Sequence, residues 1–160
     1  MTDLFSITSK IQQPDFCFVD QAKFFGIGLA TALVPSFLFH SVKQLAVQEN
    51  IALFVAVVLC TAFLLAVAYR AWAVFGSRRY MHRSDLLSHT FSQAETEERI
   101  AGIHRMGRIF AVAVVNVAYI ALAFICSFQR IFGRFELSSA FALTVGAPAS
   151  LLAFAGSFMI

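Results

Sequence analysis

This chain of 160 residues contains few charged residues. Only 13% of its residues are charged, against about a quarter in soluble domains. By contrast, 59% are hydrophobic, and the mean hydropathy is +0.78. A water-soluble fold of this length cannot bury so much apolar surface. The composition therefore excludes an ordinary soluble domain and favours a membrane protein with several spans.

Cysteines are few, and catalytic motifs are missing. Cys17, Cys60 and Cys126 lie far apart and form no CxxC pair, which argues against a thiol redox motif or a zinc knuckle. No HExxH, GxSxG or Walker sequence occurs, and there is no Asn-x-Ser/Thr glycosylation acceptor. We therefore predict that the chain is not an enzyme and that it uses neither a cofactor nor a metal ion.

Long uncharged runs are present instead, at 24–42, 51–69, 109–129 and 137–160. Each is close to the roughly 20 residues that a helix needs to cross a bilayer core of about 30 Å. The first run is too long for a cleavable signal, so we expect it to be retained as a span. The predicted fold class is an all-α membrane protein with four transmembrane helices, two within 24–75 and two within 109–160.

The distribution of Lys and Arg predicts the orientation of these spans. An even number of crossings places the N-terminal segment 1–23, the middle segment 76–108 and the C-terminus on one side of the membrane. That side carries eight basic residues: Lys10, Lys23, Arg78, Arg79, Arg83, Arg99, Arg105 and Arg108. The other side carries Lys43, Arg130 and Arg134. We therefore expect both termini and segment 76–108 to be cytosolic, with Arg70 at a helix end near the interface.

Segment 76–108 is the main polar part of the chain, with ten of the 21 charged residues and a net charge of +2. Ser92 and Glu95 fit a capping box, and no proline follows until Pro148. We therefore expect a helix from Ser92 to continue without a break into the third span. Because the second span can also continue outward, the segment is predicted to form a cytosolic basic helical hairpin between the second and third spans.

Two kinds of anionic partner fit this segment. Anionic lipid headgroups attract basic residues next to a membrane, and the guanidinium group of arginine also binds the phosphates of RNA in bidentate fashion. Histidine adds donors and a stacking surface that RNA contacts often use. The candidate residues for ribosomal RNA or ribosomal protein are Arg78, Arg79, His82, Arg83, Arg99, Arg105 and Arg108.

The predicted spans contain no Asp, Glu or Lys, and their other polar groups are few. We interpret Asn116 and Tyr119 as groups that hydrogen-bond to neighbouring helices, and His40 as an interfacial residue. A small transporter or channel is the alternative, and Asn116, Tyr119, Thr144 and His40 would be its only polar lining. A tetraspan protein that only scaffolds the membrane is a third possibility.

The chain resembles the gamma subunits of the translocon-associated protein complex, also called the signal sequence receptor. The resemblance is carried by "AKFFG" at 22–26 with Pro35, "LLAVAYR" at 64–70, "EERI" at 97–100 and "GAPASLLAFAGS" at 146–157. It implies a multi-pass protein of the endoplasmic reticulum membrane beside the Sec61 channel and the other subunits of that complex. It also implies that the hairpin anchors the complex to the ribosome and so supports co-translational protein translocation.

Overall fold

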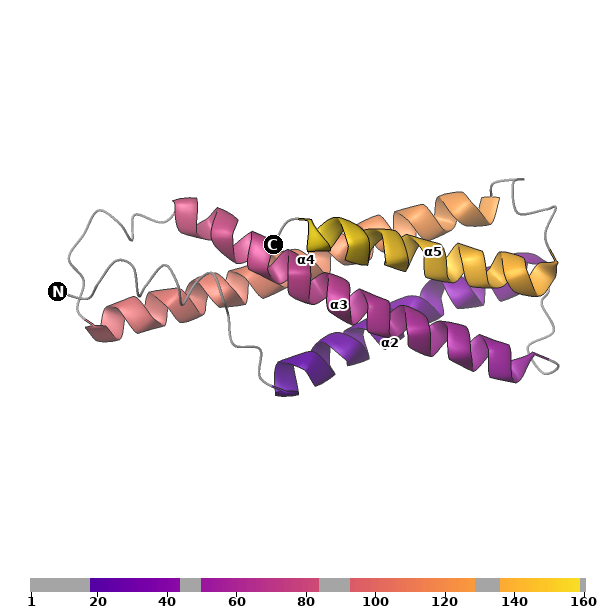
Figure 1. Ribbon diagram of the computed structural model, residues 1–160, viewed down its shortest axis with the longest axis horizontal. Helices are drawn as coiled ribbons and strands as arrows, with labels where there is room; N and C mark the ends of the chain where they lie inside the picture. Colours follow the sequence, from indigo (N-terminus) through magenta and orange to yellow (C-terminus); the bar gives the residue numbers. More distant parts are fainter. Residues whose placement is uncertain (1–17, 44–49, 84–92, 129–135, 159–160) are drawn as a thin grey trace.

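The structure, a computed structural model, describes residues 18–43, 50–83, 93–128 and 136–158. Its elements there are α2 (Phe18–Lys43), α3 (Ile51–Arg83), α4 (Gln93–Phe128) and α5 (Leu137–Ser157) (Figure 1). Each of these helices is long and apolar enough to cross a membrane. The predicted class, an all-α multi-pass membrane protein with four spans, is confirmed.

The helix bounds extend the predicted spans on one side of the molecule. α2 begins at Phe18, before the uncharged run, so the end of the predicted segment 1–23 is helical, whereas residues 1–17 lie outside the described residues. α4 runs unbroken from Gln93 to Phe128, which confirms the expected continuation into the third span. Pro35 and Pro148 lie inside α2 and α5, and neither ends its helix.

The helices alternate in direction, and α3 lies at the centre of the packing. Gly28 of α2 faces Ala62 and Leu65 of α3, whereas Phe39, nearer the end of α2, packs on the Phe141 ring that stacks against Phe54 of α3. The numbering therefore runs in opposite directions along α2 and α3. α5 runs parallel to α3 and α4 antiparallel to it (Figure 1). α3 packs against each of the other helices described, most extensively against α4.

The core consists of aromatic and small side chains between the helices. A central cluster includes Phe24, Leu65, Tyr69, Val115 and Tyr119, all buried. The same cluster contains several buried alanines. Because small residues let helix backbones approach closely, this combination is typical of helix packing in membranes. A second cluster, at the other end of the bundle, surrounds the buried Phe141 ring.

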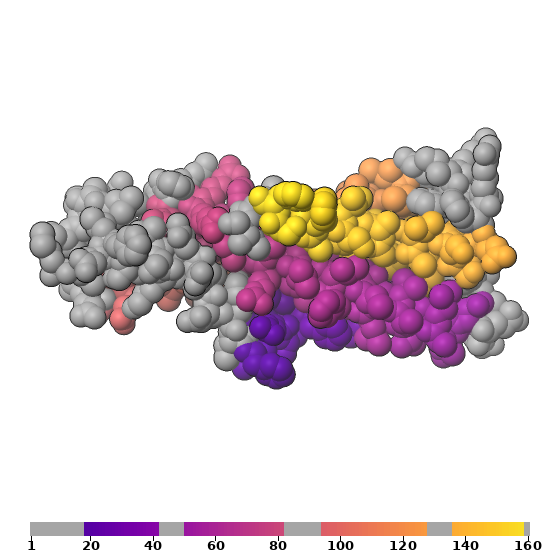
Figure 2. All heavy atoms as spheres, viewed as in Figure 1, coloured from indigo at the N-terminus to yellow at the C-terminus, as the bar shows by residue number. Residues whose placement is uncertain are grey.

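Large apolar side chains cover much of the outside of the bundle. Phe37, Phe63, Val117 and Phe154, one from each helix, are each more than 60% exposed. Figure 2 shows the face made by α3 with α2 on one side and α5 on the other. An apolar surface of this extent matches the hydrocarbon core of a bilayer and not water.

The hairpin predicted between the second and third spans is not seen in the described residues. α3 ends at Arg83 and α4 begins at Gln93, and residues 84–92, which would carry the turn, lie outside the described residues. The end of α3 and the start of α4 also diverge from each other beyond the rest of the bundle (Figure 1). The two helices therefore cross in this region, and the described parts do not lie side by side as a hairpin.

Candidate functional site

Four charged side chains lie at the end of the bundle where α2 begins and α5 ends, and beyond them the four helices no longer pack together. Arg108 of α4 donates a hydrogen bond to Oδ2 of Asp20 on α2 at 2.8 Å, and this ion pair is partly buried. Lys23 lines the same groove as this pair. We call Asp20, Lys23, Arg70 and Arg108 the charged belt.

Contacts between the helices place Arg70 and the end of α5 at this level too. Arg70 lines a groove together with Gln21, in the first turns of α2. Gly156, near the end of α5, lies against Ala71 and Trp72 of α3. The uncharged run 51–69 of α3 therefore ends where α2 begins and α5 ends. The end of this run is where Arg70 was predicted to lie at the membrane interface, and that position stays a prediction.

Beyond the belt, only α3 and α4 of the described helices continue (Figure 1). We call residues 73–83 the α3 arm and residues 93–107 the α4 arm. At 1.5 Å per residue, the arms are about 16 and 22 Å long. The α3 arm carries three arginines and no acid, whereas the α4 arm carries three glutamates and two arginines. The positive charge is therefore concentrated on the α3 arm.

The arms meet where two glycines face each other. A Cβ atom on Gly107 would lie 2.8 Å from the carbonyl oxygen of Ala73 and 2.9 Å from the backbone nitrogen of Ser77. A Cβ on Gly76 would lie 2.9 Å from a ring carbon of Phe110. Only glycine allows this close approach. This crossing was not predicted from the sequence, although Gly76 and Gly107 lie at the two edges of the polar segment.

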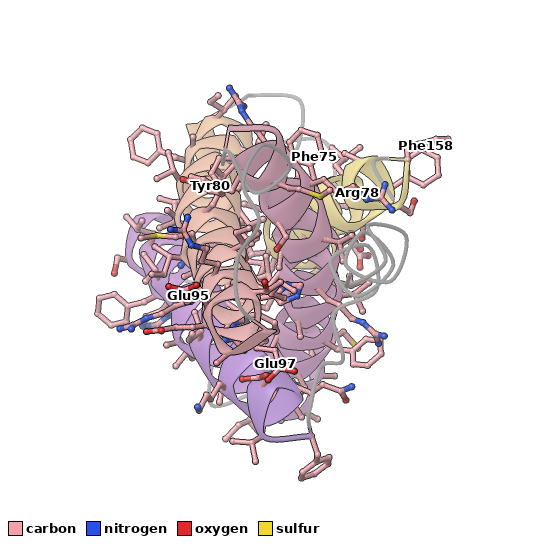
Figure 3. All side chains as sticks on the ribbon, turned by 90° about the vertical axis from the view of Figure 1, so that its left-hand side faces the viewer. Phe75, Arg78, Tyr80, Glu95, Glu97 and Phe158 are labelled. Atoms are coloured by element: carbon pink, nitrogen blue, oxygen red, sulfur yellow. The ribbon has the colours of Figure 1, made fainter. Side chains whose placement is uncertain are left out.

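The predicted contact residues are distributed over the two arms and the base of the α4 arm. Arg79, Arg99 and Arg105 are exposed, whereas Arg78 is half-buried. His82 and Arg83 lie in α3, but their side chains are outside the described residues. In Figure 3, Arg78 lies on the side of α5, whereas Tyr80 lies on the side of α4. Glu95 and Glu97 lie lower in that view, on the α4 arm.

Arg108, one of the candidate residues, pairs with an acid on another helix. Its guanidinium binds the Asp20 carboxylate, and the side chains of the pair are 37% and 20% exposed. The pair joins α4 to α2 at the base of the α4 arm. The only sequence signal for it was an acid in the first turn of α2, which a helix dipole alone would explain.

Polar groups within the spans bond to one another. The Oδ1 atom of Asn116 on α4 accepts hydrogen bonds from the hydroxyl of Thr31 on α2, at 3.2 Å, and from the hydroxyl of Tyr69 on α3. We call these three residues the polar triad. Tyr119 donates to the carbonyl oxygen of Val145 on α5 at 3.2 Å. The prediction that Asn116 and Tyr119 hydrogen-bond to neighbouring helices is confirmed.

The hydrogen bonds of these polar groups weaken the case for a transporter. Asn116 and Tyr119, two of the four residues proposed to line a polar path, are engaged in contacts between helices. Thr144 is fully buried, and His40 is exposed near the far end of α2. Within the parts of the chain that the structure describes, no group of three or more His, Cys, Asp or Glu residues is placed to hold a metal ion.

Comparison with protein-family models and with curated proteins found no match to the chain. The resemblance to the gamma subunits of the translocon-associated protein complex therefore stays a prediction from the residues quoted above.

Proposed function

We propose that the chain is a non-enzymatic accessory subunit of the protein translocon in the endoplasmic reticulum membrane, and that its arms anchor a ribosome on the cytosolic side. In this proposal the spans contact the Sec61 channel and the other subunits of a translocon-associated complex. The observation that carries the proposal is the extension of α3 and α4 beyond the charged belt as unbroken helices with exposed arginines.

The α3 arm is the main contact in this proposal. It is the arm with an excess of positive charge, and Arg79 and Arg83 lie four residues apart, on one face of the helix. Arginines four residues apart on a helix suit adjacent phosphates of an RNA backbone. The α4 arm has a net charge of −1, so its exposed arginines, Arg99 and Arg105, are secondary contacts.

Replacing Arg79 and Arg83 together by glutamine tests the proposal. A hydrogen bond to a charged group contributes about 1.5 kcal/mol or more, so losing two contacts is expected to weaken ribosome binding by roughly a hundredfold. The salt dependence of binding should also become shallower, by about one unit of log–log slope per arginine. The measurement is co-sedimentation of ribosomes with the full chain in nanodiscs, between about 50 and 200 mM salt. Arg78 is left in place because it is half-buried.

The charged belt supplies the matched control. Arg108→Gln combined with Asp20→Asn removes an ion pair without changing the net charge, and we expect ribosome binding to be retained. Equal binding by the arginine variant and the wild-type chain would contradict the proposal. A chain that only scaffolds the membrane would bind no ribosomes at any salt concentration, and a transporter would instead show solute flux in liposomes.

A further inference from the structure

A groove between α2 and α4 opens beside the ion pair of Asp20 and Arg108. Its volume is about 520 Å³, within the range of about 300–1,000 Å³ that is typical of small-molecule sites. α2 lines the groove with Asp20, Lys23, Phe24 and Ile27, which follow the i, i+3, i+4, i+7 spacing of one helix face. Residues of α4 between positions 108 and 113 form the facing side.

The groove has a charged end and an apolar end. Thr31 bonds to Asn116, and Asp20 bonds to Arg108, so the numbering runs in the same direction along α2 and α4. The ion pair therefore lies at one end of the groove, and Ile27 lies at the other. Seven residues of helix separate Asp20 from Ile27, so the groove is about 10 Å long.

The charged end offers an acceptor and a donor that no described residue occupies. Arg108 donates to Oδ2 of Asp20, which leaves Oδ1 of that carboxylate able to accept a hydrogen bond. The exposed Lys23 ammonium has no hydrogen bond or ion pair within the described ranges. Because Lys23 follows Asp20 by three residues, two groups of opposite charge lie next to each other on one helix face.

We propose that this groove binds phosphatidylethanolamine, with the phosphate at Lys23, the ammonium at Oδ1 of Asp20 and an acyl chain along the apolar end. A short methylene link joins the phosphate of this lipid to its ammonium, so both groups reach side chains three residues apart on a helix. Hydrogen bonds between ionised groups are about twice as strong as neutral ones. The uncharged run of α2 begins at Phe24, directly after Lys23, so we expect the apolar end to face hydrocarbon.

The primary ammonium distinguishes this lipid from other phospholipids. Phosphatidylcholine carries the same phosphate, but its quaternary nitrogen has no N–H to donate to Asp20. Phosphatidylserine adds a carboxylate, which would lie near the negative charge of Asp20. A groove between α2 and α3, with a volume of about 480 Å³, offers no partner for an ammonium, because the described residues that line it include no acid.

Native mass spectrometry of the full chain tests the proposal directly. The chain in detergent micelles is mixed with lipids of identical acyl chains that differ only in methylation of the nitrogen, from phosphatidylethanolamine through its dimethyl form to phosphatidylcholine. We expect phosphatidylethanolamine to bind about tenfold more tightly than phosphatidylcholine, since a hydrogen bond to a charged group contributes about that factor. The dimethyl form, which keeps an N–H, should also bind more tightly than phosphatidylcholine. Soluble glycerophosphoethanolamine should not compete, because it lacks acyl chains.

Variants separate the contributions of the three contacts. Asp20→Asn should bring the affinities for phosphatidylethanolamine and phosphatidylcholine close to each other. Glu136→Gln makes the same change in net charge at an exposed acid before α5, at the opposite end of the bundle, and should leave their ratio unchanged. Lys23→Gln keeps the ion pair and should weaken binding of both lipids about fivefold. Ile27→Trp, which fills the apolar end, should also weaken both.

Several results would overturn the proposal. These are equal binding of the two lipids by the wild-type chain, an unchanged ratio in Asp20→Asn, an equal loss in Glu136→Gln, or undiminished binding by Lys23→Gln. Competition by glycerophosphoethanolamine would also overturn it, as would a second copy of the chain that binds in place of the lipid and is lost in Ile27→Trp. No ribosome takes part in these measurements, so their outcome is independent of the proposed function.

Discussion

Replacing Gly107 by alanine is expected to destabilise the chain by about 1–3 kcal/mol, whereas the same replacement at Gly102 is expected to stabilise it. At Gly107 the new Cβ would lie under 3 Å from two backbone atoms of α3, which cannot move aside as a flexible side chain could. At Gly102, on the same helix, a Cβ would meet nothing within 4 Å. Alanine there should contribute up to about 1 kcal/mol through its higher helix propensity.

The change in the free energy of unfolding should have opposite signs in these two variants. It is measured by reversible unfolding in mixed detergent micelles. α2 offers a second matched pair, because a Cβ on Gly28 would lie 2.8 Å from the carbonyl oxygen of Ala62, whereas Gly26 has open space. We expect Gly28→Ala to be the more destabilising replacement of that pair. Shifts of the same sign and size at Gly107 and Gly102 would show that the two helices are not in close contact there.

A second large effect is expected from the polar triad. Asn116→Leu removes the oxygen that accepts two hydrogen bonds. The hydroxyls of Thr31 and Tyr69 then lose this acceptor inside the bundle. Hydrogen bonds between membrane helices contribute about 0.6 kcal/mol on average and up to about 1.7. We therefore expect a loss of about 1–3 kcal/mol in the free energy of unfolding, measured in the same micelles.

A double-mutant cycle separates this loss from a change in packing. If the cost of Asn116→Leu comes from unpaired hydroxyls, adding Tyr69→Phe should cost little more or restore stability, because both partners are then removed. Ser150→Ala is the control, since the Ser150 hydroxyl is exposed and bonds to the carbonyl of Gly146 in its own helix. Strictly additive effects of Asn116→Leu and Tyr69→Phe would contradict the assigned bond between these residues.

The spans were predictable because their signals are local. An uncharged run of about 20 residues is enough to indicate a membrane helix, and the absence of proline between Ser92 and the third span predicted the continuity of α4. Polar residues in such runs usually bond to neighbouring helices, so the general role of Asn116 was predictable too. These features depend on residues close together in sequence.

Contacts between distant residues were not predictable. Asp20 and Arg108 are 88 positions apart, and no periodic pattern connects them. The same holds for the divergence of the arms, which depends on which helix faces meet at Gly76 and Gly107. Gly26 and Gly28 are only two residues apart, but a Cβ atom would meet α3 at Gly28 and nothing within 4 Å at Gly26. Each of these contacts depends on the direction in which side chains point once the helices have packed together.

The polar triad has a consequence for biogenesis. Tyr69 and its acceptor Asn116 are 47 positions apart, so at about 5–20 residues per second the ribosome needs roughly 2–10 seconds to synthesise the chain between them. During that delay the first two spans exist without the third, and the hydroxyls of Thr31 and Tyr69 have to be satisfied by water or by an insertion factor. The final assembly of this bundle therefore waits for the third span to be made.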